Sequence, residues 1–191
     1  MNPDHSLGAA ARRVTFFLLL VVLAGCADFP LAPLPDTAPE GKDAFALDGK
    51  LGVVADGHGF YANMRWRHAG GDDDIVLATP LGQGVARIER NATGVTLTTA
   101  DGRVLSAPDG ETLTEQALGW RLPLNGLPYW ARGEPAPGGY QWLPDGSGIE
   151  QDGWKVEWER NAGGLPYRIT LHRDNLQVRL AVTAWSGGGA P

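Results

Sequence analysis

Few side chains in this 191-residue sequence have the types and spacing that catalysis or metal binding requires. The four histidines are scattered, and none stands at metal-ligand spacing from another. Gly82-Gln83-Gly84 lacks the rest of a phosphate-loop pattern, and the sequence has no nucleophile elbow. Several carboxylates fall in polar clusters typical of turns, where we expect them to be solvated: Asp72, Asp73, Asp74, Asp101 and Asp145. The sequence therefore predicts a protein that is not an enzyme, with no metal site and no cofactor.

The single cysteine, Cys26, is the one side chain whose surroundings indicate covalent chemistry. No second cysteine is present to pair with it in an oxidising compartment. It follows a basic pair, Arg12 and Arg13, and an uncharged apolar run from Val14 to Val22. This layout is typical of a secretory signal peptide, and the run is shorter than the about 20 apolar residues that a membrane-spanning helix needs. We predict that residues 1–25 are a signal peptide.

The segment Leu23-Ala24-Gly25-Cys26 resembles the bacterial lipobox, whose cysteine is diacylated and becomes the first residue of the mature protein. The resemblance implies that Cys26 is a lipid anchor, and the absence of an acidic residue at position 27 favours the outer membrane. Because one acyl chain alone binds a bilayer marginally, two or three chains are needed for firm attachment. The alternative is a secretory signal that ends by chance near a free, buried cysteine.

The remainder of the chain has the composition of one soluble domain. The full sequence carries 16 Lys and Arg against 22 Asp and Glu, a net charge of −6, which argues against nucleic acid as a partner. Residues 26–43 are rich in proline and predict an extended, lipid-anchored tether. We expect the folded domain to span residues 44–186 and residues 187–191 to form a disordered tail.

Alternation of apolar and polar residues predicts many short strands. Residues 45–107 indicate a meander of about six strands, although the polar stretch 70–74 is expected to be a loop. Two short helices are predicted, from about Asp109 to Leu118 and after Asn125, and about five more strands follow residue 140. About eleven antiparallel strands fit a mainly β fold, a curved sheet or open barrel with helices over its opening. Periodicity alone does not decide between a filled core and a ligand cavity.

Leu81 is the most unusual apolar residue, because the turn formers Pro80 and Gly82 flank it and would place it at a loop tip. An exposed leucine there could enter a bilayer surface or the groove of a partner. The alternative is a leucine folded back onto the sheet. Six tryptophans are each expected in the core: Trp66, Trp130, Trp142, Trp154, Trp158 and Trp185.

Several segments, in this order and downstream of a lipobox, resemble the outer-membrane lipoprotein receptor family LolB. They are residues 45–51, Trp66, residues 80–86, 122–135, 151–156 and 165–169, and residues 178–185. The resemblance implies a half-closed antiparallel β-barrel with short helices as a lid over an apolar cavity. It also implies a receptor that takes lipoproteins from a soluble periplasmic LolA-like carrier, shelters their acyl chains and inserts them into the outer membrane.

The same resemblance suggests roles for individual residues. The loop Pro80-Leu81-Gly82 would assist membrane delivery, and a first choice of cavity residues is Phe45, Leu47, Leu51, Met64, Trp66, Leu97 and Ile169. The implied partners are the carrier, acylated lipoprotein cargo and outer-membrane lipid, with the protein itself a monomer. Two alternatives stay open: a lipid-anchored, lipocalin-like barrel for a small apolar ligand, and a structural envelope lipoprotein with a filled core.

Overall fold

The computed structural model describes residues 34–41, 43–118, 121–122 and 124–187. The predicted signal peptide, Cys26 and the last four residues lie outside these ranges. The described chain forms one antiparallel sheet of eleven strands, and two short helices join its two halves. The mainly β, half-open fold predicted from the sequence is confirmed. None of the helices in the described residues is long and apolar enough to cross a membrane.

The strands of the first half are β1 (Phe45–Ala55), β2 (His58–Ala69), β3 (Asp72–Ala78), β4 (Gly84–Asn91), β5 (Gly94–Thr99) and β6 (Val104–Ala107). Those of the second half are β7 (Gln141–Trp142), β8 (Gly148–Gln151), β9 (Trp154–Arg160), β10 (Pro166–Arg173) and β11 (Leu176–Ser186). The helices α2 (Gly110–Leu118) and α3 (Leu127–Arg132) lie between the halves.

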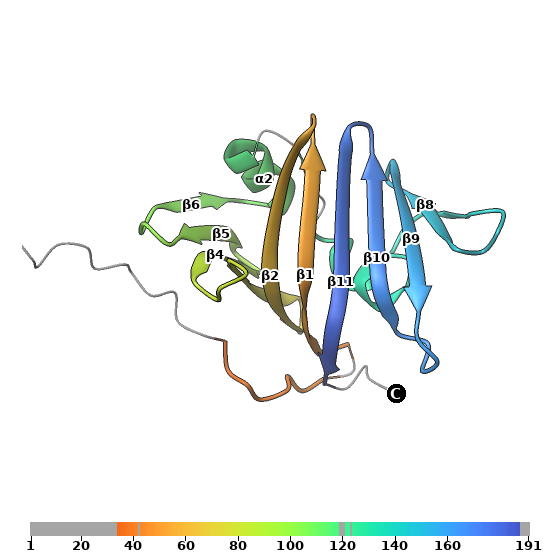
Figure 1. Cartoon of the computed structure of the whole chain (residues 1–191), viewed down its shortest axis with the longest axis horizontal. Helices are drawn as coiled ribbons and strands as arrows, with labels where there is room; N and C mark the ends of the chain where they lie inside the picture. The colour runs from red at the N-terminus through yellow and green to blue at the C-terminus, as the bar shows by residue number, and fades with distance from the viewer. Residues whose placement is uncertain (1–33, 42, 119–120, 123, 188–191) are drawn as a thin grey trace, which may run out of the picture.

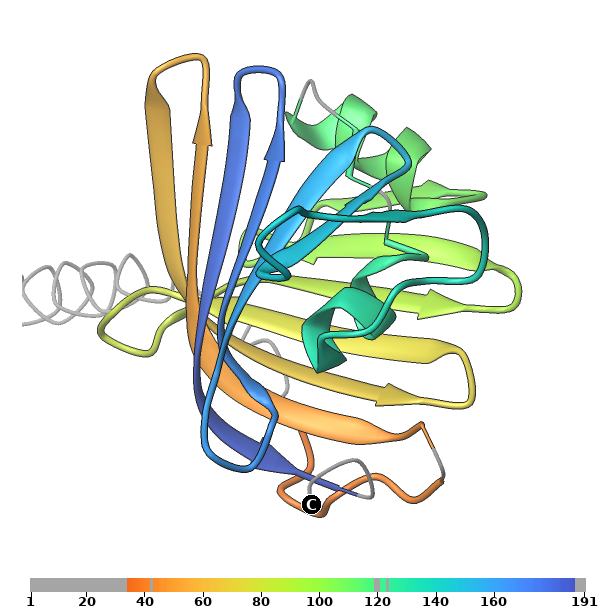
Figure 2. The ribbon, with the colours of Figure 1, turned by 90° about the vertical axis from the view of Figure 1, so that its right-hand side faces the viewer.

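The strand order explains why the helices cover the sheet. The order is β6-β5-β4-β3-β2-β1-β11-β10-β9-β8-β7, so β1 and β11 pair in the middle and β6 and β7 are the two edges (Figure 1). The chain must therefore travel from one edge to the other after β6. It does so across the concave side, where both helices lie (Figure 2). The helices α2 and α3, with the segment between them, thus cover the apolar concave face, and we call this part of the chain the helical cover.

The concave face carries the apolar half of each strand's alternation, as a half-buried strand requires. In β1 the buried side chains include Phe45 and Leu47, and in β2 they include Met64 and Trp66. Phe45 packs edge to face against Trp66, with ring centroids 5.0 Å apart. The inward face that the sequence left undecided is therefore the one that carries these residues.

The hairpin between β2 and β3 is tighter than the sequence indicated. Only Gly70 and Gly71, both with positive φ, form the turn, and β3 begins at Asp72. The expectation that Asp73 and Asp74 are solvated loop residues is therefore wrong. Asp73 points to the concave side and is 6% exposed, while Asp74 points outward and binds the guanidinium of Arg87 through both oxygens.

Helix α2 begins at a side-chain cap and packs on the edge of the sheet. The carboxylate of Asp109 accepts the backbone N–H of Thr112 at 2.7 Å, and this hydrogen bond holds the pKa of Asp109 below its usual value. One turn into the helix, Leu113 is buried against Val95 of β5 and Ala107 of β6. This contact fixes one side of the helical cover to the β6 edge.

Gly49 permits a close approach between the two central strands. The pairing of β1 with β11 shifts register between Asp48 and Gly49, and a Cβ atom on Gly49 would lie 2.7 Å from the carbonyl oxygen of Ala181. Such a distance is a backbone clash, so any larger residue would force the middle of the sheet apart.

We expect Gly49→Ala to lower the free energy of unfolding by about 1–3 kcal/mol, because this clash cannot be relieved by a side-chain rotation. Gly139→Ala is the matched control, since a Cβ there meets no atom within 4 Å. Urea denaturation of both variants measures the difference. Equal stability of the two would show that β1 and β11 adjust freely at this point.

Candidate functional site

The space between the sheet and the helical cover contains an apolar cavity of about 90 Å³. Its lining side chains come from six strands, from α3 and from the segment before it, and all are apolar. They are Leu51, Met64, Trp66, Ile75, Leu77, Ile88, Leu122, Leu124, Leu127, Trp130, Ala131, Ile169, Leu171, Val178 and Leu180. A wall of this kind offers no hydrogen bond and suits a hydrocarbon ligand.

The structure brings together some of the cavity residues chosen from the sequence. Leu51, Met64, Trp66 and Ile169 line the cavity. Phe45 and Leu47 are buried on the same face but lie outside the lining, and Leu97 packs against a second cluster under α2. Sequence reasoning missed the contribution of the cover, although residues 122–131 are apolar at every second or third position.

The volume of this cavity is small compared with an acyl chain. Ligand sites of proteins are typically about 300–1,000 Å³. The cavity of about 90 Å³ is well below this range and is small for a whole acyl chain. A longer chain can enter only if the cover moves away from the sheet.

The carboxyl-terminal end of α3 is firmly attached to the second half of the sheet. Trp130 is completely buried, and its Nε1 donates to Oε1 of Gln151 at 2.9 Å. The indole of Trp158 donates to the carbonyl oxygen of Trp130 at 2.7 Å, and Arg160 donates to that of Gly133 at 2.6 Å. Because each donor and acceptor is buried or partly buried, detaching this end would leave several polar groups unpaired.

The other end of the cover is held by fewer contacts. Asp73 accepts hydrogen bonds from Nε1 of Trp66 at 2.8 Å and pairs with Nδ1 of His68 at 2.7 Å. Its second oxygen binds Arg90, whose Nη1 reaches up to Oδ1 of Asn125 at 3.0 Å. Asn125 lies just before α3, so this chain of contacts links the wall of the sheet to the cover. The link ends in one exposed hydrogen bond.

Leu81 occupies the tip of a hydrogen-bonded turn. The N–H of Gly82 donates to the carbonyl oxygen of Thr79, and the N–H of Thr79 donates to that of Gln83, each at 2.8 Å. Gly82 has a φ of +86°, the left-handed conformation that closes this type of hairpin loop. Leu81 is 90% exposed, so the leucine is not folded back onto the sheet. The loop, yellow-green in Figure 2, projects away from the two helices.

Residues 43–185 match the family model described as "Outer membrane lipoprotein LolB". The outer-membrane lipoprotein LolB of Chromobacterium violaceum is 39% identical over 178 residues, which cover 91% of this chain and 98% of the relative. That of Thiobacillus denitrificans is 38% identical over 183 residues, covering 91% and 97%. A crystal structure of a LolA superfamily protein from Nitrosomonas europaea aligns with a TM-score of 0.44 at 9% identity, over 76% of this chain and 86% of its own.

A half-open β-barrel with an apolar cavity under a helical cover is suited to holding hydrocarbon. The match over most of the chain shows that the protein belongs to the LolB family of outer-membrane lipoproteins. It is accordingly a lipid-anchored protein of the outer membrane. Its role is that of a lipoprotein receptor in localisation, which is transport without catalysis.

We expect Asn125→Ala to loosen the cover locally. The substitution removes the single hydrogen bond between Arg90 and this segment and leaves the buried pair of Arg90 with Asp73 intact. Global stability should fall by about 1 kcal/mol or less, while amide hydrogen exchange should accelerate within residues 124–132. Unchanged exchange there would show that apolar packing and the hydrogen bond of Leu122 to Thr114 hold this end without Asn125.

Proposed function

We propose that this protein accepts lipoproteins from a soluble periplasmic carrier, shelters their acyl chains beneath the helical cover and inserts them into the outer membrane. The observation that supports this proposal most directly is the purely apolar cavity between cover and sheet. An acylated cargo needs such shelter, because each methylene exposed to water costs about 0.8 kcal/mol.

Loading requires the cover to open at the end held by Asn125. The carboxyl-terminal end of α3 makes buried or partly buried hydrogen bonds with Gln151, Trp158 and Arg160. The opposite end is joined to the sheet by apolar contact and by one exposed bond to Asn125, and to α2 by the hydrogen bond from Leu122 N–H to Oγ1 of Thr114. The cover therefore turns about the α3 end, and residues 122–127 move away from the first half of the sheet. The surface exposed by this movement is covered again by the acyl chains.

Transfer then needs no external energy source. Opening the empty cavity exposes apolar side chains, and this costs free energy. The receptor therefore binds cargo less tightly than a preformed cavity of the same area would. The bilayer offers complete burial of every methylene and retains the cargo. A receptor that binds chains more tightly than the carrier and less tightly than the bilayer passes them in one direction.

Leu81 is proposed to enter the bilayer surface during delivery. Burying one leucine side chain is worth about 1.5–3 kcal/mol, which suits a brief contact rather than an anchor. The anchor itself is Cys26, which we propose is acylated. From Cys26 to Leu34 an extended chain reaches at most about 29 Å.

The point where the tether meets the domain supports this orientation. Leu34 is buried on the outside of the sheet, and Asp36 pairs with Arg65 at 2.9 Å. Leu34 and Gly82 border the same surface hollow. The end of the tether and the Leu81 loop therefore lie on one side of the domain, which would face the membrane.

Reconstituted transfer tests the proposal. Cargo loaded on the carrier is mixed with membranes that hold the wild-type protein, Leu81→Glu or Leu81→Met. We expect Leu81→Glu to fold and accept cargo normally, because the residue is 90% exposed, but to deliver at most a tenth as much to the bilayer. Leu81→Met keeps an apolar tip and should deliver normally.

Two results would contradict different parts of the proposal. Failure of the wild-type protein to take cargo from the carrier would exclude the receptor function itself. Normal delivery by Leu81→Glu would leave the receptor function intact and remove the loop from it.

A further inference from the structure

A second hollow, lined in part by polar side chains, lies at the mouth of the half-barrel beside α3. Its volume is about 770 Å³, within the range of ligand sites. Three arginines contribute to its lining: Arg90, Arg132 and Arg173. Arg90 is bound to Asp73, and Arg132 donates to the carbonyl oxygen of Asp43 and to Glu134. Arg173 differs from both in its surroundings.

The guanidinium of Arg173 is available to a ligand. Within the part of the chain that the structure describes, its charge partner is Asp174 at 3.9 Å, too far for a hydrogen bond. The side chain is 38% exposed and its Cζ lies 5.6 Å from the ring centre of Trp154. The guanidinium therefore keeps its donors free over the face of an aromatic ring.

Trp154 supplies a second free donor in the same place. The residue is 1% exposed, and among the described residues no atom accepts a hydrogen bond from its Nε1. A buried donor without an acceptor is rare in folded proteins and calls for an explanation. Trp130 and Trp158, also buried, both have acceptors for their indole N–H groups.

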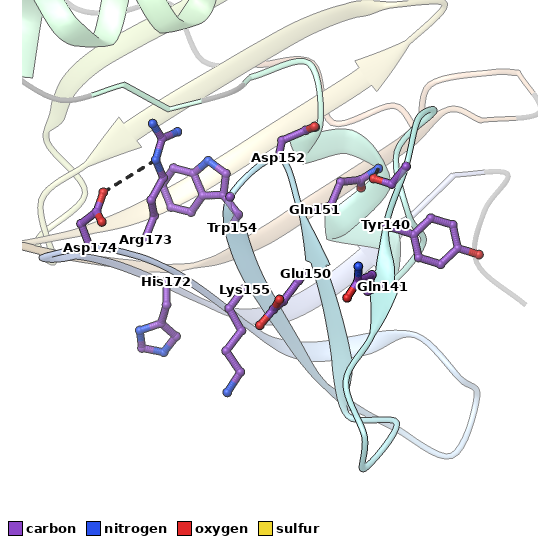
Figure 3. Close-up of a pocket in the computed structure, with 12 residues that line it drawn as sticks. Tyr140, Gln141, Glu150, Gln151, Asp152, Trp154, Lys155, His172, Arg173 and Asp174 are labelled. Carbon is purple, nitrogen blue, oxygen red and sulfur yellow. Dashed lines mark hydrogen bonds and ion pairs between the residues drawn. The ribbon is translucent and has the colours of Figure 1, made fainter.

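The two donors face the same side of the sheet. In Figure 3 the indole nitrogen of Trp154 and the guanidinium of Arg173 lie on the upper side of the drawn residues, while His172 and Lys155 point away below. Both donors belong to residues that line the mouth. Two donors with no acceptor between them form a site for an oxygen atom.

The position of this site along the strand indicates what carries the oxygen. On β10, Ile169 and Leu171 line the apolar cavity, and Arg173 follows on the same face. Two residues of a strand advance about 7 Å. An apolar strip that ends in two hydrogen-bond donors matches an amphiphile whose hydrocarbon chain begins at a carbonyl group.

We propose that Trp154 Nε1 and the guanidinium of Arg173 bind an ester carbonyl oxygen at the head of the cargo's diacylglyceryl chains. This inference rests on the proposed function, which supplies the acylated cargo. A neutral carbonyl fits better than a phosphate, because Asp152 lines the same mouth and Asp174 adjoins Arg173. These two carboxylates would repel a full anion.

The test compares ester with ether linkages. The whole mature chain carrying Cys26→Ser, which removes its own acyl chains, is titrated with a synthetic N-acyl-S-diacylglyceryl-cysteine peptide. The second ligand has the same chain lengths but ether linkages, so it lacks the glyceryl carbonyl oxygens. We expect the wild-type domain to bind the ester form about five- to tenfold more tightly.

Substitutions then assign this preference to the two donors. Trp154→Phe and Arg173→Gln should bind both ligands with nearly equal affinity. Trp142→Phe should keep the preference, because Trp142 is exposed on the edge strand β7. Trp154→Phe breaks no hydrogen bond to a described residue, so its melting temperature should fall less than that of Trp130→Phe.

The possible outcomes separate the site from the function. Equal affinity of the wild-type domain for ester and ether peptides would overturn the carbonyl site while leaving the receptor function in place. No binding of either peptide would overturn the receptor function, and the site with it. An ester preference for phosphatidylglycerol as large as that for the peptide would assign the oxygen to bilayer lipid and overturn its assignment to cargo.

Discussion

The apolar concave face of the sheet is the constraint on which the rest of the structure depends. A curved sheet that is not closed must cover this face or expose a large apolar surface to water. Because β1 and β11 pair in the middle, the chain has to cross from the β6 edge to the β7 edge, and this crossover is the cover. The same segment therefore completes the core and controls access to it.

The two ends of the cover are held to the sheet by different numbers of contacts. This difference would allow one end to open and admit an acyl chain, as the proposed function requires. Trp130 holds one end in place. Its indole donates a hydrogen bond to Gln151, and its carbonyl oxygen accepts one from the indole of Trp158. The other end is joined to Asp73 only through Arg90 and Asn125. A cavity of about 90 Å³ is what remains when the cover is down. Its capacity for longer chains depends on how far the weaker end moves.

The local pattern of apolar, polar and turn-forming residues was sufficient to predict most of the fold. Alternation and turn residues predicted about eleven strands and two short helices, because each strand has one buried and one exposed face. The same reasoning placed Asp73 in a loop, since three consecutive aspartates look like a turn, although Asp73 is buried by partners on β2 and β4. Trp142, expected in the core, is 56% exposed because β7 is a two-residue edge strand.

The candidate site could be predicted only in part, for a physical reason. The strand residues that line the cavity stand at every second position, on the inward face of their strands. Leu51, Met64, Trp66 and Ile169 could therefore be chosen from the sequence. The contacts that hold the cover join residues far apart in the chain, such as Arg90 and Asn125, and no local pattern reports them. The free donor on Trp154 likewise depends on what surrounds it in three dimensions.

Photo-crosslinking with a lipoprotein that carries a diazirine near the end of one acyl chain tests the central claim most directly. The cargo is delivered by the carrier to the full-length, membrane-anchored protein, and labelled peptides are identified by mass spectrometry. The account predicts labels on residues that face the cavity, such as Leu124, Ala131 and Leu171. Labels confined to the outer face of the sheet, at residues such as Val76 and Thr170, would contradict it.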